Sequence, residues 1–281
     1  MKVLVTGAGG LVGKALTDHC RYLKDIVFSY QHQDLDIADA PAVRQVILDK
    51  LPDVVINCAA WTNVDACEFD EARAFAVNAA GPANLANACR EAGAIFVTIS
   101  TDYVFDGTKH GFYTQSDEPN PESVYAASKL EGERRAAFTY DRSIIVRTGY
   151  VFGRNGSNFL STVVERAKRG GDLKAISDTY GTPTYTKDLA ERLRQLAQVN
   201  FPGLYHVVNN GPGVSFEQFT RKAIALVGNP EASVEAVSEK ALNRPAKRPA
   251  NSRLRCLLTG KVGLAPLRDW ENALEEFVRS Y

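Results

Sequence analysis

The sequence predicts an α/β fold in which helices cover both faces of a doubly wound parallel sheet. Apolar runs such as Val54-Val55-Ile56 and Ile95-Phe96-Val97 alternate with helical patterns along the first half of the chain. This alternation is typical of βα units with a parallel sheet. A glycine-rich turn also follows the first apolar run directly, at residues 7–13, where a nucleotide-binding fold needs it. Together these observations predict a Rossmann-type sheet with a small C-terminal substrate-binding lobe.

Each element of this fold is predicted by an apolar run or by a helical period. The expected strands are 2–6, 26–30, 53–57, 94–99, 143–148 and 204–208. The expected helices are 11–22, 39–50, 68–92, 123–140, 156–170, 188–199, 215–227 and 268–280. Gly81-Pro82 could break the long helix at 68–92.

The alternation loosens after about residue 155, and the stretch 229–266 is rich in Pro, Asn and Arg. We therefore expect a nucleotide-binding domain over 1–155, to which 185–210 returns. The smaller lobe is expected over 156–184 and 211–281. Ligands of such folds bind at the carboxyl ends of the strands. Residues 57–61, 100–101 and 148–150 end three of the predicted strands, so they mark the expected active rim.

The composition excludes several classes of protein. The 281 residues carry 33 basic and 33 acidic side chains, a formal net charge of zero, which argues against a nucleic-acid binder. No apolar run approaches the roughly 20 residues of a membrane helix, and the chain starts with a strand rather than a signal peptide. The 5 Cys and 4 His show no metal-binding spacing. We expect a cytoplasmic protein with reduced thiols and no membrane partner.

The glycines of the first turn have the spacing G-x-x-G-x-x-G. Gly7 is expected to allow the tight strand-to-helix turn, Gly10 to let the backbone approach a pyrophosphate, and Gly13 to permit close packing of helix on strand. The helix that follows would present free N–H groups to the phosphates. The alternative is a flexible turn without a ligand, which the strand before it and the helix after it disfavour.

The second strand ends without the acidic side chain that would bind the ribose 2′-hydroxyl of NAD. Residues 29–33 read Ser-Tyr-Gln-His-Gln, with neither an acid nor an arginine. A 2′-phosphate is therefore not repelled, and NADPH is mildly favoured while NADH could also be accepted. Asp36-Ile37 could reach the adenine edge, or Asp36 could cap the helix that begins near Asp39.

Tyr125 and Lys129 are four residues apart, which places them on one face of a helix. A lysine cation beside a tyrosine favours the phenolate and is expected to lower its pKa. Thr101 could hold a substrate oxygen next to the tyrosine, so the three side chains are suited to moving a proton at a carbonyl oxygen. The pair alone could also arise by chance, and its weight comes from the nucleotide-binding turn that precedes it.

A set of motifs in order along nearly the whole chain resembles the dTDP-4-dehydrorhamnose reductase family of the extended short-chain dehydrogenase/reductase superfamily. The shared stretches are Gly7-x-x-Gly10-x-x-Gly13, Asn57-x-Ala59-Ala60-Trp61-Thr62-x-Val64-Asp65, Val77-Asn78-Ala79, Ser100-Thr101-Asp102-Tyr103-Val104-Phe105-Asp106-Gly107, Val124-Tyr125-x-x-Ser128-Lys129-x-x-Gly132-Glu133, Arg147-Thr148, Asn158-Phe159, Tyr180-Gly181-x-Pro183-Thr184, Gly203-Leu204-Tyr205-His206 and Arg248-Pro249-x-Asn251-Ser252-x-Leu254. The stretches that begin at Ser100 and Arg248 are the most specific. The resemblance implies that NADPH reduces the 4-keto group of a dTDP-6-deoxy-L-lyxo-hexulose to give dTDP-L-rhamnose.

The resemblance also implies roles for individual residues. Tyr125 would give its proton to the 4-keto oxygen, Lys129 would hold the nicotinamide ribose, and Thr101 would bind the same oxygen. The implied cofactor contacts are Gly7, Gly10, Leu11, Val12, Gly13, Asp36, Ile37, Ala59, Ala60, Trp61, Asn78, Ser100, Tyr125 and Lys129. The implied substrate contacts are Thr101, Asp102, Tyr103, Val104, Tyr150, Asn158, Thr184, Arg248 and Ser252. Trp61 could instead serve packing, and Arg248 could form a surface ion pair.

The chain departs from the family at several positions. Some relatives dimerise around Mg²⁺ through acidic residues, where this chain has Ala15 and Lys187. We therefore expect no Mg²⁺ and a monomer or weak homodimer; if a metal were bound, Glu165, Asp188 and Glu191 would be the next candidates. Tyr150 stands where the family often has Trp, which leaves the exact ketosugar open.

Two other functions remain open. A non-catalytic NADP-binding subunit, like the regulatory subunit of methionine adenosyltransferase, resembles the same family and acts through a partner. A sugar-nucleotide epimerase with tightly held NAD also carries Tyr and Lys. The complete set of Tyr125, Lys129 and Thr101 favours an enzyme over the subunit. The missing acid after the second strand and the motif at Arg248 favour a reductase over the epimerase.

Overall fold

A computed structural model describes all 281 residues. Six parallel strands form one sheet in the order β10-β5-β4-β3-β1-β2, so the order reverses between β1 and β3. The strands are β1 (Lys2–Thr6), β2 (Ile26–Tyr30), β3 (Val54–Asn57), β4 (Ile95–Thr101), β5 (Ser143–Thr148) and β10 (Gly203–His206). All six were predicted, with bounds that differ by two residues at most, and the doubly wound parallel sheet is confirmed.

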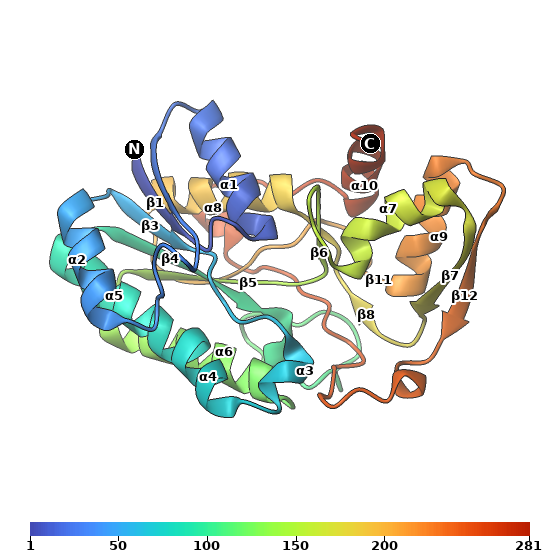
Figure 1. Cartoon of the computed structure of the whole chain (residues 1–281), viewed down its shortest axis with the longest axis horizontal. Coiled ribbons are helices and arrows are strands. Elements are labelled where there is room, and N and C mark those ends of the chain that lie inside the picture. The colour runs from blue at the N-terminus through green and yellow to red at the C-terminus, as the bar shows by residue number, and fades with distance from the viewer.

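Helices cover both faces of this sheet (Figure 1). One face carries α1 (Leu11–Tyr22) and α8 (Thr186–Val199), and the other carries α2 (Ala40–Lys50), α5 (Gly81–Ala92) and α6 (Val124–Thr139). Side chains alternate along β1: Val3 and Val5 pack under α1 and α8, whereas Leu4 packs under α2 and α5. This alternation buries β1 on both faces, as expected of a central parallel strand.

The long helix predicted over 68–92 is three consecutive pieces. α4 (Glu71–Phe75) begins at Asp70, which caps it, and the π-helical turn η1 (Ala76–Ala80) leads into α5. The short helix α3 (Val64–Cys67) precedes them. The irregularity therefore lies just before Gly81-Pro82: Pro82 has no N–H to donate to the preceding turn, and that turn is π-helical. The π turn brings Asn78 to the active rim.

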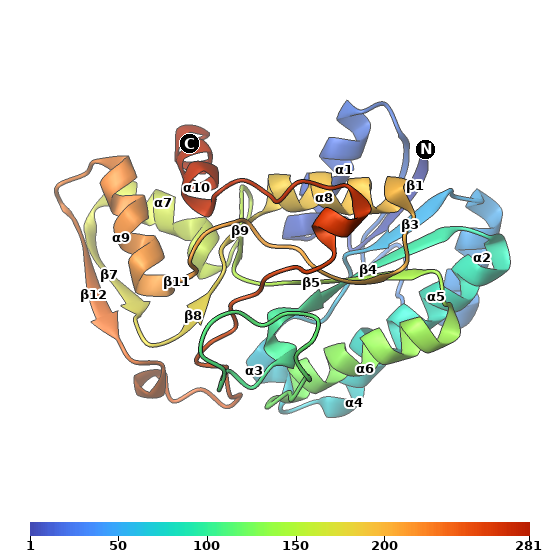
Figure 2. The ribbon, with the colours of Figure 1, turned by 180° about the vertical axis from the view of Figure 1, so that it is seen from behind.

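A second group of elements packs beside the sheet (Figure 2). It consists of β6 (Val151–Phe152), α7 (Phe159–Arg169), β7 (Gly171–Ile176), β8 (Tyr180–Gly181), β9 (Thr184–Tyr185), β11 (Val214–Ser215), α9 (Phe216–Val227), β12 (Ala232–Val237) and α10 (Trp270–Arg279). Its core is aromatic and separate from the two sheet clusters: Phe152 stacks on Tyr185 and packs edge-on against Phe219 and Phe277. The small lobe is present, and its short strands were not predicted. The exact domain boundaries stay predictions.

An extended strap over 246–255 joins the lobe to the sheet half. Its backbone bonds to Tyr113 on one side and to Tyr180 on the other. Gly107 has a φ of +82°, and a Cβ there would lie 2.6 Å from the Ala250 nitrogen, so the strap passes directly over this glycine. Single turns, η2 (Asp102–Val104), η3 (Glu239–Leu242) and η4 (Thr259–Val262), complete the chain. None of the helices combines the length and apolarity that crossing a membrane requires.

Candidate active site

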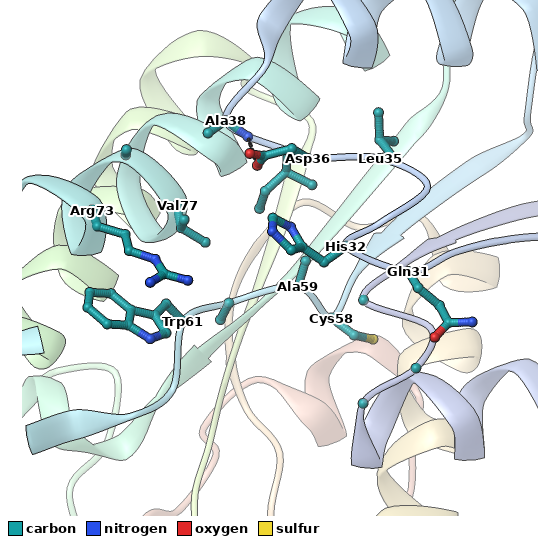
Figure 3. A pocket seen from close by; sticks show the side chains of 16 residues that line it. Gln31, His32, Leu35, Asp36, Ala38, Cys58, Ala59, Trp61, Arg73 and Val77 are labelled. Carbon is teal, nitrogen blue, oxygen red and sulfur yellow. Dashed lines mark hydrogen bonds between the residues drawn. The ribbon is translucent and has the colours of Figure 1, made fainter. Parts of the chain in front are cut away.

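An elongated groove of about 590 Å³ opens at the point where the strand order reverses (Figure 3). This is the place where open α/β sheets bind their ligands. The glycine turn forms one end of the groove and Trp61 the other. The lining residues are Gly7, Gly9, Gly10, Gln31, His32, Leu35, Asp36, Ile37, Ala38, Cys58, Ala59, Ala60, Trp61, Arg73, Ala76 and Val77.

The glycine turn has the geometry that the spacing predicts. Gly7 has a φ of +65°, and a Cβ there would lie 2.5 Å from the Ala59 nitrogen. A Cβ on Gly13 would lie 2.2 Å from the Gly7 oxygen, so α1 packs against the turn at backbone contact. Gly10 is the N-cap of α1, and no side chain caps the helix. The first N–H groups of α1 therefore face outward as a site for an anion. Leu11 and Val12 supply part of this first turn, although they do not line the groove.

The β2 end of the groove is polar and carries no acid next to the strand. Gln31 and His32 line it, and the Gln31 side chain covers Gly9. Asp36 and Ile37 also line the groove, with Asp36 accepting a hydrogen bond from the Ala38 nitrogen at 2.9 Å. The alternative that Asp36 caps the next helix is wrong, because Asp39 is the N-cap of α2. Asp36 is therefore free to face a ligand on its groove side.

At the far end, an arginine that was not predicted stacks on Trp61. The Arg73 guanidinium lies 4.6 Å from the centre of the Trp61 ring, and Figure 3 shows the two planes facing each other. Trp61 also packs against the small cluster that contains Tyr125. The Trp61 side chain thus links the groove to Tyr125. Sequence spacing gave no signal for Arg73, because the stacking depends on how α4 crosses the loop after β3.

Asn78 holds this loop against α6 rather than facing the groove. Its side chain binds both backbone groups of Trp61, at 2.9 and 3.1 Å, and donates to the Ser128 hydroxyl at 3.1 Å. The backbone carbonyl oxygen of Asn78 would lie 2.1 Å from a Cβ at position 132. Only a glycine there lets α6 cross the π turn this closely. Asn78 is 1% exposed. Its expected cofactor contact stays a prediction, and what it does here is position Trp61 relative to Tyr125.

Tyr125 and Lys129 lie on the inner face of α6, below the Trp61 end of the groove. Both are buried, and the Lys129 Nζ donates a hydrogen bond to the Ile99 carbonyl at 2.7 Å. Burial lowers the pKa of Lys129 to about 8. The prediction that Lys129 lowers the pKa of Tyr125 is wrong: burial raises the Tyr125 pKa above its ordinary value, and the Thr101 side chain offsets only part of that rise. Tyr125 is therefore protonated at neutral pH, as a proton donor must be.

Thr101 ends β4 and faces Tyr125 from the sheet. Its hydroxyl accepts a hydrogen bond from the Tyr103 nitrogen at 3.2 Å and donates to Asp102 at 3.2 Å. The Tyr103 ring packs edge-on against Tyr125, with ring centres 6.3 Å apart. Val104 is fully buried in a separate apolar cluster. The hydroxyl of Ser100, one residue earlier, is buried without a hydrogen-bond partner, as is that of Thr148 at the end of β5. Two unpaired donors at neighbouring strand ends fit a polar ligand on this rim.

The chain matches a family model described as the RmlD substrate binding domain over residues 1–281. It is 38% identical to a dTDP-4-dehydrorhamnose reductase of Streptomyces griseus, over 97% of this chain and 91% of that one. A dTDP-4-dehydrorhamnose reductase from Clostridium acetobutylicum has a TM-score of 0.94 at 38% identity, covering 100% of this chain and 99% of the other. The enzyme of this name from Bacillus anthracis, solved in complex with NADP, has a TM-score of 0.95 at 32% identity, covering 100% and 99%.

The chain belongs to the dTDP-4-dehydrorhamnose reductase family. This membership makes the protein an oxidoreductase with a Rossmann-type fold. It confirms the family that the sequence motifs indicated.

Two residues expected to bind the substrate of this reductase make local bonds instead. Asn158 caps α7 by accepting from the Ser161 nitrogen at 2.9 Å, and its amide nitrogen donates to the Val151 carbonyl. Thr184 is fully buried, and its hydroxyl donates to the Thr182 carbonyl at 3.2 Å. These bonds fix the strands that join the lobe to the sheet half. A direct substrate contact by either residue stays a prediction.

Tyr150 forms a wall between the sheet half and the lobe. It has a φ of +46°, in the left-handed region that only glycine adopts freely. Its ring lies directly over Gly181, where a Cβ would be 2.2 Å away, and 4.4 Å from the Phe216 ring centre. The absence of a side chain at Gly181 thus makes room for the aromatic ring. This accounts for the glycine at position 181.

Arg248 forms an ion pair, as the alternative to substrate binding expected, but its side chain is buried rather than at the surface. Its two terminal nitrogens donate to the two Asp65 oxygens at 2.6 and 2.8 Å, and one of them also donates to the Ala246 carbonyl. The ion pair lowers the pKa of Asp65 and ties the strap to α3. Of the five guanidinium N–H groups, these bonds use three. The edge formed by Nε and one Nη remains for another acceptor.

A buried ion pair behind the rim was also not assigned a role from the sequence. Arg147 on β5 donates to both Glu133 oxygens on α6, at 2.8 and 2.6 Å, and both side chains are buried. The pair fastens α6 to the sheet. No group of three or more His, Cys, Asp or Glu side chains is arranged to hold a metal ion. Lys187 pairs with Glu276, and Asp188 pairs with Arg268. The expected lack of Mg²⁺ and the expected monomer or weak homodimer stay predictions.

Proposed function

We propose that this protein reduces the 4-keto group of a dTDP-4-keto-6-deoxy-L-hexose with NADPH, giving dTDP-L-rhamnose. The observation that carries the proposal is the hydrogen bond between the side chains of Tyr125 and Thr101 beside Trp61. Trp61 closes the groove whose other end is the uncapped N-terminus of α1. The family relatives carry the name of this reaction. One relative binds NADP in its crystal structure.

The groove fits a dinucleotide on two counts. The uncapped first turn of α1 at Gly10 offers N–H donors to a pyrophosphate, and Asp36 and Ile37 flank the space beyond it. Trp61 closes the other end next to the catalytic cluster. When bound, NADPH would supply a hydride to the keto carbon. A site without an acid after β2 accepts the 2′-phosphate of NADPH, and it also leaves NADH usable.

Tyr125 would act as the proton donor to the keto oxygen. Burial keeps it protonated at neutral pH, so the proton is present when negative charge develops on that oxygen. Thr101 would donate a second hydrogen bond to the same oxygen and stabilise its charge. Lys129, held by the Ile99 carbonyl, would place its cation beneath the ribose of the nicotinamide. The free edge of Arg248 would bind a phosphate oxygen of the nucleotide sugar.

An assay that follows NADPH absorbance directly tests the proposal. Purified protein is mixed with NADPH and a panel of nucleotide 4-ketosugars, and the absorbance of NADPH is followed while products are identified by mass spectrometry. Loss of NADPH with formation of the dTDP-6-deoxyhexose supports the proposal. NADPH that binds but is never consumed with any ketosugar would indicate a non-catalytic subunit, and a product formed without net loss of NADPH would indicate an epimerase.

A further inference from the structure

The carboxyl group of Asp102 lies next to the catalytic hydroxyls but has no contact with the groove. Its side chain is 3% exposed, and its two oxygens bind the hydroxyls of Thr101, at 3.2 Å, and of Ser252. A Cβ on Gly149 would lie 2.3 Å from this carboxyl group, so Gly149 makes the space for it. No basic side chain lies within ion-pair distance of Asp102. A buried carboxylate without a cation is rare, because its charge loses hydration without compensation.

The Thr101 hydroxyl has one proton to give and two lone pairs to fill. The Tyr103 nitrogen fills one lone pair. When Asp102 is ionised, the Thr101 proton must point at the carboxylate, and the remaining lone pair is an acceptor for the Tyr125 hydroxyl. When Asp102 is protonated, its O–H can fill that lone pair, and the Thr101 proton is then free to point toward the reacting oxygen.

We propose that Asp102 is a positioning residue whose own protonation sets the direction of the Thr101 hydrogen bond. With Asp102 neutral, Thr101 and Tyr125 both donate to the keto oxygen of the substrate. With Asp102 ionised, Thr101 donates away from that oxygen and also competes with it for the Tyr125 proton. Ketone reduction therefore runs from the neutral form of Asp102. This inference rests on the proposed function and assigns Asp102 a task other than the substrate contact that was expected from the sequence.

The groups that surround Asp102 keep its pKa within the physiological pH range. The side chains of Tyr103, Tyr125 and Tyr150 surround it from three segments, and all three are neutral at neutral pH because burial raises their pKa values. The charged side chains nearby are Arg244 and Arg248, whose cations act on Tyr103, and Glu239, whose carboxylate acts on Tyr150. Burial raises the pKa of Asp102 to about 6, with the Ser252 and Thr101 hydroxyls offsetting part of the rise.

The test compares pH profiles of kcat/KM for ketone reduction in the wild type and Asp102→Asn. Asparagine has the shape of the neutral acid and can donate to Thr101 at every pH. In the wild type, kcat/KM should fall about tenfold per pH unit above the Asp102 pKa, and this limb should be missing in Asp102→Asn. Asp269→Asn is the matched control: Asp269 caps α10 far from the rim, asparagine caps equally well, and its profile should follow the wild type.

Two further measurements test whether the ionisation of Asp102, acting through Thr101, causes the fall in kcat/KM at high pH. Thr101→Val should also lose the limb, together with part of the maximal rate, because there is no hydroxyl left to turn. Carbon-13 NMR of protein labelled at the aspartate carboxyl carbons should show one resonance that titrates near neutral pH and is missing from Asp102→Asn. A limb that persists in Asp102→Asn or in Thr101→Val would overturn the inference while leaving the function intact. A wild-type protein that reduces no ketosugar would overturn the function instead, and NMR would still report the ionisation of Asp102.

Discussion

Removing the side chain of Arg248 should weaken both substrate binding and the fold, by amounts that the structure separates. In Arg248→Ala, Asp65 loses a bidentate partner, and the Arg248 side chain is 9% exposed whereas that of Asp65 is 33% exposed. Breaking a fully buried pair costs about 3–5 kcal/mol. Because Asp65 keeps access to water, we expect about 2 kcal/mol, or a fall in Tm of about 4–8 °C.

The same variant loses the guanidinium edge that we assign to the nucleotide phosphates. A hydrogen bond to a charged group contributes about 1.5–3 kcal/mol, so KM for the nucleotide sugar should rise about 10–100-fold with a smaller change in kcat. Steady-state kinetics and a melting curve measure the two effects. Asp65→Asn is the matched control: it should lower Tm while leaving the phosphate-binding edge in place, so KM should change less. An equal loss with a substrate that lacks the nucleotide would refute the phosphate contact and leave Arg248 a role in the fold alone.

Two further predictions concern residues of α6, and a third concerns Mg²⁺. Lys129→Met should lower the rate and weaken NADPH binding. It should also remove the fall in rate that the wild type shows as pH rises through about 8 and Lys129 loses its proton. A pH–rate profile and an NADPH affinity that match the wild type would contradict this role. Gly132→Ala should lower stability by about 2 kcal/mol through overpacking, because its Cβ would meet the Asn78 oxygen at 2.1 Å, whereas Gly260→Ala, which faces open space, should melt with the wild type. EDTA should change neither activity nor the mass measured by light scattering, since Lys187, which we expect at the position of a metal-binding acid in some relatives, pairs with Glu276. A dimer that dissociates on chelation would show that a metal ion bridges two copies of the chain.

The sheet half was predictable because its signals are local. Each central strand is an apolar run, and the glycine spacing at 7, 10 and 13 dictates a backbone path that the structure follows. The lobe was less predictable. Its strands β6, β8, β9 and β11 are two residues long and form through pairings between distant segments, so no period marks them in the sequence.

The candidate site divides in the same way. Tyr125, Lys129 and Thr101 could be found by spacing and by motif, because helix geometry and strand ends fix where such side chains lie. The pKa of Tyr125 could not be predicted, because it depends on burial by Trp61, Tyr103 and Cys67, which come from other segments. An ion pair of Arg248 was expected only as an alternative, and its partner could not be named, because a sequence does not reveal that Asp65, 183 residues away, lies beside it.

The most direct test of the central claim is the single-turnover rate of Tyr125→Phe with a saturating dTDP-4-keto-6-deoxy-L-hexose and NADPH. The substitution removes the proton donor and almost no volume, so the melting temperature and the affinity for NADPH should match the wild type. General acid catalysis is typically worth about 10²–10⁴-fold, and we expect a loss of that size in the rate of NADPH oxidation. A Tyr125→Phe protein that reduces the ketosugar at close to the wild-type rate would contradict the assignment of Tyr125 as the proton donor.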